Sequence, residues 1–250
     1  MKSLSQHITE KLVLNNNAKV RKYNYRPITS IELDKLIERL IEERGNDADL
    51  NDIDVSEITD MTNMFRYKNS SFNGDISKWN VSNVENMEGM FYRSEFNGDI
   101  SNWDVSNVKN MNWMFTESVF TNDISNWDVS NVTTTWGMFA RSNFNGDISK
   151  WDVSKVIKMT AMFSGSKFNT NISDWDIRKV KEMGYMFYTS EFNQDISKWD
   201  VRKVKDFCNM FEFSKFNQDI SKWKINKNAN VRYMFNDCQI NDKYIPEIPE

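Results

Sequence analysis

The sequence has few of the residues that build most catalytic and metal sites. Its 250 residues include one histidine, two cysteines and three prolines. Its eight glycines match no phosphate-binding loop. The lone His7 stands in a terminal segment, so Ser-His-Asp and Cys-His arrangements lack a general base and zinc lacks ligands. We therefore expect no enzymatic activity, no cofactor and no metal site.

Long apolar runs are also missing. The first residues contain no stretch of 7 to 15 apolar residues that would make a secretory signal, and no run approaches the 18 residues of a membrane span. The net charge of -4 disfavours nucleic-acid binding by global charge attraction. We expect a chain in the cytoplasm or on a virion, with another protein as partner, and nucleic acid unlikely.

What the chain has in abundance is a repeated pattern of large apolar residues. It contains 17 Phe, 9 Trp and 14 Met, and most of them recur every 24 residues. The Phe column that starts each unit is Phe72, Phe96, Phe120, Phe144, Phe168, Phe192 and Phe216. Trp and Ile columns keep the same step, and Met-Phe pairs complete the unit. Seven full units and one partial unit before them occupy residues 50 to 239.

Written once, the unit is F-N-G-D-I-S-x-W-D-V-S-N-V-x-x-M-x-x-M-F-x-x-S-x, and we number its positions from the Phe. Positions 13 to 20 carry apolar residues at steps of three and four, which predicts a short helix. Positions 3 to 10 predict a short strand. Such a unit is too small to bury its own apolar face, so neighbours must stack. The expected fold class is an α/β solenoid: a leucine-rich-repeat-like stack of short parallel strands and short helices.

Two columns of carboxylates accompany the apolar columns. Asp stands at position 4 in most units, as in Asp99 and Asp147, and also at position 9 in most units, as in Asp104 and Asp152. Stacked like charges repel, so we expect each carboxylate to accept a backbone N–H in a local turn. Calcium between the units is the alternative, although Asn171 interrupts one column.

The phrase that runs from Phe96 to Val108, followed by Met111 and the pair Met114-Phe115, resembles the BspA-like leucine-rich-repeat surface proteins. The resemblance covers residues 50 to 239. It implies a leucine-rich-repeat-like fold and a role in adhesion or protein binding. By resemblance alone it also implies the cell surface of a bacterium, and similar repeats occur in phages of gut bacteria.

The ends of the repeat array differ from the array itself. Residues 29–49 predict a capping helix, because Thr29 and Glu32 form a capping box, apolar residues follow at helical spacing, and Gly45 ends it. Residues 1–28 predict an N-terminal helical segment over 3–14 and a basic linker. That segment either docks a partner or packs on the cap. Residues 240–250 form a C-terminal stop segment with prolines.

Positions where the repeat varies are the candidate binding sites, since packing already explains the constant ones. Large aromatic residues replace small or polar ones at positions 17 and 18, where they would lie on the predicted helix but off its apolar face: Trp113, Trp136, Tyr185 and Tyr233. Exposed aromatic residues of this kind are typical of interface hot spots. Packing between units is the alternative explanation.

A second variable region carries positive charge in the C-terminal half. This basic stripe comprises Lys155, Arg178, Lys179, Lys181, Arg202, Lys203, Lys205 and Lys227. It would either bind an anionic partner or balance the Asp columns.

Three functions remain open at this point. The first is a non-catalytic scaffold for protein-protein interaction or adhesion through a lateral surface. The second is a self-assembling structural component, for example of a virion or surface layer. The third is a polyanion or nucleic-acid binder that uses the basic stripe.

Overall fold

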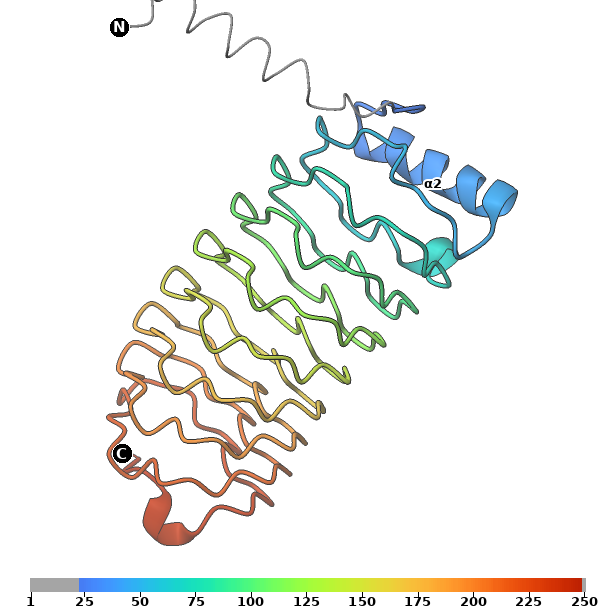
Figure 1. Ribbon diagram of the computed structural model, residues 1–250. Coiled ribbons are helices and arrows are strands. Elements are labelled where there is room, and N and C mark those ends of the chain that lie inside the picture. The colour runs from blue at the N-terminus through green and yellow to red at the C-terminus, as the bar shows by residue number, and fades with distance from the viewer. Residues whose placement is uncertain (1–22, 249–250) are drawn as a thin grey trace, which may run out of the picture.

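The computed structural model describes residues 23–248 and shows a stack of looped coils with one helix at its N-terminal end (Figure 1). Within these residues there is one α-helix, α2 (Ser30–Arg44), and two 3₁₀ helices, η1 (Tyr67–Asn69) and η2 (Asp242–Tyr244). Each 24-residue unit forms one coil. The helix expected over residues 3–14 lies outside the described residues.

The helix α2 covers the first coil. Thr29 is its N-cap and accepts the Glu32 N–H at 3.2 Å, while the Glu32 carboxylate accepts the Ile28 N–H at 2.9 Å. At the other end Gly45 has a φ of 87° and donates its N–H to Ile41. Three residues of one face, Leu33, Ile37 and Leu40, are fully buried in the core of the stack. Burial of this face closes the N-terminal end.

The expected α/β solenoid is wrong in its local structure. No β-strand and no α-helix occurs in any coil between residues 46 and 240. Neighbouring coils pair through isolated parallel bridges, such as Asn110 with Thr134 and Thr134 with Lys158. The chain is therefore a stack of turns and loops, and the predicted leucine-rich-repeat-like strands and helices do not form.

Tight turns take the place of the predicted helix at positions 13 to 20. In one coil Met114 donates its N–H to Met111, and Ser118 donates to Phe115. The third residue of each turn, Trp113 or Glu117, has a φ of 53° or 55°, which is the pattern of a type II turn. The equivalent residues of other coils repeat this positive φ. Residues with a positive φ do not occur inside an α-helix. The apolar residues at steps of three and four therefore belong to consecutive turns.

The same turns prevent a continuous strand. Along positions 16 to 22, every second N–H donates to a carbonyl of the next coil, as Trp113 does to Trp136 at 2.7 Å. The intervening N–H groups donate within their own coil to close the turns. Because half of the donors are used locally, a regular ladder cannot form.

The core consists of side-chain columns that run along the stack. The Phe rings of successive coils lie in near-parallel pairs, with centroids 5.9 Å apart for Phe139 and Phe163. Each Trp of the repeat is also fixed by its indole N–H, as when Trp151 Nε1 donates to the Ile124 carbonyl at 3.1 Å. Phe163 and Ile124 are at most 1 % exposed. Neighbouring coils therefore bury the Phe, Trp and Ile side chains that a single coil would leave exposed, as the sequence predicted.

Candidate binding surface

One long side of the stack carries the variable residues, and we call it the turn face. It comprises positions 16 to 22 of each coil, that is, residues 61–67, 87–93, 111–117, 135–141, 159–165, 183–189, 207–213 and 231–237. Side chains at positions 17, 18, 21 and 22 are the more exposed ones, because the intervening Met and Phe point into the core. All four predicted aromatic residues lie on this face.

Trp113 and Trp136 come together, as their positions in adjacent coils predicted. Their ring centroids are 4.6 Å apart at an angle of 49°. Trp136 is 41 % exposed, whereas Trp113 is half-buried. Trp113 lies against Gly137 of the next coil, where an added Cβ would be only 2.6 Å from Trp113 Cδ1. The pair therefore combines packing between coils, the alternative considered for these residues, with an exposed ring.

Tyr185 and Tyr233 lie two coils apart, and Tyr185 belongs to a second aromatic group. Tyr185 contacts Tyr188 edge-on at 5.6 Å, and Tyr188 contacts Phe213 at 6.0 Å. Tyr185 is 42 % exposed, Phe213 50 % and Tyr233 53 %. Burial, together with Cys208, raises the pKa of the Tyr185 phenol. The sequence reasoning missed Phe213 because it considered only positions 17 and 18.

A third group at the start of the face was also missed. The Arg66 guanidinium lies between two tyrosine rings, 4.5 Å from the centroid of Tyr67 and 3.9 Å from that of Tyr92. Tyr67 is 70 % exposed. Tyr67 occupies position 22 and Tyr92 position 21, so both lie outside positions 17 and 18, where the sequence predicted exposed aromatic residues.

Three charged side chains at the centre of the turn face are paired with one another. Glu117 accepts from Arg93 Nε at 2.8 Å and from Arg141 at 3.4 Å, so one carboxylate links three coils. The hydrogen bond from Arg93 is the main reason that the pKa of Glu117 is lowered. The central part of the face therefore presents little unpaired charge beside its aromatic rings.

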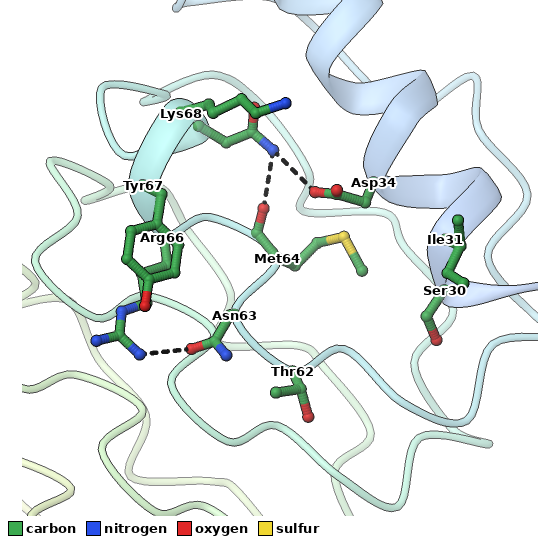
Figure 2. Close-up of a pocket in the computed structure, with 10 residues that line it drawn as sticks. Ser30, Ile31, Asp34, Thr62, Asn63, Met64, Arg66, Tyr67 and Lys68 are labelled. Carbon is green, nitrogen blue, oxygen red and sulfur yellow. Dashed lines mark hydrogen bonds between the residues drawn. The ribbon is translucent and has the colours of Figure 1, made fainter.

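A pocket lies where α2 meets the first coil (Figure 2). Ser30, Ile31 and Asp34 approach it from α2, and residues 62–69 form the other wall. Its polar groups are largely paired: Asn69 Nδ2 donates to Asp34 at 3.3 Å and to the Met64 carbonyl at 3.0 Å. No nucleophile and base face each other among the residues that line it. The pocket is best described as the junction between cap and stack.

The Asp columns make the local turns that were expected of them. Asp147 Oδ1 accepts the Ser149 N–H at 2.9 Å, and Asn171, which interrupts the column, accepts the Ser173 N–H at the same distance. The Ser149 backbone N–H lowers the pKa of Asp147. An amide oxygen therefore fills the same role as a carboxylate. Within residues 23–248 no group of three or more His, Cys, Asp or Glu could hold a metal ion.

Comparison with known proteins places this architecture in a family. The profile of a family described as "Mycoplasma protein of unknown function, DUF285" matches residues 35–143 and residues 137–247, which together make up most of the chain. The chain belongs to the DUF285 family. This repeat family is BspA-like, so the resemblance is confirmed at that level, but the match supports neither a leucine-rich repeat nor an adhesive role. No curated protein and no solved structure matches the chain.

In this DUF285 chain the basic stripe lies outside the turn face, along positions 11 to 14. Its two arginines are neutralised in part, because Arg178 and Arg202 each form a bidentate pair with the Asp two residues before. The hydrogen bond from Arg178 lowers the pKa of Asp176 to about 2. The six lysines of the stripe differ from the arginines, because all are exposed and none forms an ion pair within residues 23–248. They are Lys155, Lys179, Lys181, Lys203, Lys205 and Lys227. A small open pocket beside Lys179 and Lys203 is lined also by Ser154 and Asp176.

None of the α-helices in the described part of this DUF285 chain is long and apolar enough to cross a membrane.

Proposed function

We propose that this chain is a non-catalytic scaffold that binds another protein through its turn face. One observation carries the proposal: the chain buries its structural rings almost completely but leaves the variable ones in water. Trp151 of the repeat is 4 % exposed and Phe163 is 0 % exposed, whereas Tyr67, Trp136, Tyr185, Phe213 and Tyr233 are 41 to 70 % exposed. Aromatic rings in water on one side of a rigid stack are the side chains that most often anchor protein interfaces.

The arrangement of these rings supports a protein partner more than a small ligand. They occur in groups along the whole length of the stack, from Tyr67 in the first coil to Tyr233 in the last. At the centre of the face three charged residues, Arg93, Glu117 and Arg141, are already paired. In that part a partner would meet apolar rings without first displacing unpaired charges. An adhesive role would be one form of this activity.

A comparison of two variants tests the proposal. Trp136→Ser, Tyr185→Ser and Phe213→Ser together remove three exposed rings, and Ile157→Ser removes an exposed apolar side chain outside the turn face. We expect a protein captured by the intact chain from its source cells to be lost with the triple variant and kept with Ile157→Ser. Both variants should keep the unfolding midpoint near that of the parent. Equal capture by all three proteins would contradict the proposal.

The lysine column favours a second candidate, the binding of a linear polyanion. Lys155, Lys179, Lys203 and Lys227 occupy the same position in four successive coils, and coils stack at about 4.8 Å. A row of ammonium groups that form no ion pair within residues 23–248 would attract a chain of phosphates or sulfates by counterion release. We expect retention on heparin that falls steeply with salt. It should weaken when Lys179, Lys203 and Lys227 are changed to Gln, whereas unchanged retention would exclude the stripe.

A further inference from the structure

The two ends of the stack are chemically different. At every junction, N–H groups of one coil donate along positions 16 to 22 to carbonyls of the following coil. At the last junction the donors Phe207, Asn209, Phe211 and Phe213 bind the carbonyls of Asn230, Arg232, Met234 and Asn236 at 2.7 to 3.0 Å. Along the turn face the stack therefore has an acceptor edge at its N-terminal end and a donor edge at its C-terminal end.

The donor edge of the last coil has no partner among the residues that the structure describes. The equivalent N–H groups of Val231, Tyr233, Phe235 and Asp237 have no acceptor within residues 23–248. Phe235 stacks on Phe211 at 5.7 Å, but its other ring face lacks the next ring of the column. As a result Phe235 is half-buried, whereas Phe211 is fully buried. The edge thus presents a row of donors beside a partly exposed aromatic ring.

The C-terminal segment covers a different part of the last coil. Ile240 takes the place of the Phe that would start another unit, and Asn241 donates its N–H to the Asn217 side chain as earlier units do. The carbonyl of Tyr244, the last residue of η2, accepts the Ile220 N–H at 3.1 Å. These contacts close the side that holds positions 1 to 5 and leave the turn face open. The cap at this end is therefore half complete.

A second copy of the folded chain does not complement this edge. Two C-terminal ends placed together would set N–H groups against N–H groups. Carbonyls of the complementary acceptor edge are already engaged within the chain: Ser30 Oγ of the cap donates to the Asp60 carbonyl at 2.5 Å, and Asn69 donates to the carbonyls of Met64 at 3.0 Å and Arg66 at 3.3 Å. The occupant must bring free carbonyls from elsewhere.

We propose that the donor edge of the last coil binds a peptide segment of another polypeptide, which adds to the stack as one more coil. The chemistry of this partner follows from the junctions inside the chain. It offers a backbone carbonyl at every second residue over about seven residues, and an aromatic side chain that stacks on Phe235. This is edge addition by backbone pairing, with the same contacts that already join coil to coil. The edge belongs to the last coil of the turn face, but this proposal does not rest on the function proposed for that face.

The test uses the full chain and a synthetic peptide with the sequence of residues 106–119, which spans positions 11 to 24 of one coil. Amide hydrogen exchange is followed with and without the peptide. In the free chain we expect fast exchange at Val231, Tyr233, Phe235 and Asp237. We expect slow exchange at Phe207, Asn209, Phe211 and Phe213, which serve as the internal control. Peptide addition should slow the first set at least tenfold and leave the second unchanged.

Two variants sharpen the result. The peptide carrying Phe115→Asp loses the ring that would stack on Phe235 and should give no protection. The protein variant Val231→Pro lacks one donor and should bind the peptide about tenfold more weakly. Protected amides at Phe207 to Phe213 will show that this variant is folded. If it is not, the exchange pattern of the unmodified chain decides the question alone.

Three outcomes would overturn the proposal. The first is that the four amides are already protected in the dilute free chain, which would mean that residues of the chain itself cover the edge. The second is protection that appears only as protein concentration rises, which would identify a second copy. The third is peptide binding without any slowing at the four amides.

Discussion

Trp113 lies against the backbone of Gly137 in the next coil, and Gly137 itself has a φ of 63°. A Cβ at position 137 would overlap the indole, and alanine disfavours this φ by about 1 kcal/mol. We expect Gly137→Ala to destabilise the chain by about 2 to 3 kcal/mol in urea unfolding. Adding Trp113→Ala should recover the part due to the overlap, so the double-mutant cycle should show coupling. If the effects of the two substitutions on the free energy of unfolding simply add, the contact between Trp113 and Gly137 is not formed.

Ala161 and Ala140 provide a matched pair for the turn geometry. Both are half-buried alanines on the turn face, but only Ala161 has a positive φ, of 55°. We expect Ala161→Gly to be neutral or to stabilise the chain by up to about 1 kcal/mol, because glycine adopts this φ without strain. Ala140→Gly should destabilise it by about 0.5 to 1 kcal/mol through chain entropy. If both substitutions shift the unfolding midpoint in the same direction, the turns are not formed as described.

Truncating a Phe at position 20 should cost less stability at the open end of the stack than in its middle. Phe163 is fully buried between rings of both neighbouring coils, while Phe235 has a ring on one side only. We expect Phe163→Ala to cost about 3 to 5 kcal/mol, as usual for a buried ring. Phe235→Ala should cost clearly less. If chemical denaturation shows that Phe163→Ala and Phe235→Ala lower the free energy of unfolding equally, the end of the stack is covered.

The Asp turns should make stability depend on acid pH. Hydrogen bonds lower the pKa of Asp147 and bring that of Asp176 to about 2. A carboxyl whose folded pKa is depressed contributes stability above its unfolded pKa near 4, and that contribution is lost as pH falls towards the folded pKa. The urea midpoint should therefore fall between about pH 4.5 and pH 2. Asp176→Asn should flatten this dependence while keeping the turn, as Asn171 does in its own coil.

The features that could be predicted from the sequence are those that depend on the burial of apolar side chains. The 24-residue step of Phe72 and its successors requires stacking, because one coil has no interior of its own, and these rings are fully buried. Local signals also sufficed at the cap, where Thr29 and Gly45 bound α2. Neighbouring positions in adjacent coils were enough to bring Trp113 next to Trp136.

The conformation of each coil was decided only by the tertiary structure. An apolar spacing of three and four fits a helix, but it fits equally well a series of turns whose positive φ falls on Trp113 or Tyr185. Nothing local separates the two, because a single turn of helix is not stable alone and the deciding hydrogen bonds run to a coil 24 residues away. The half-open last coil likewise depends on contacts between coils. The N–H of Phe235 finds an acceptor only if another coil lies above it.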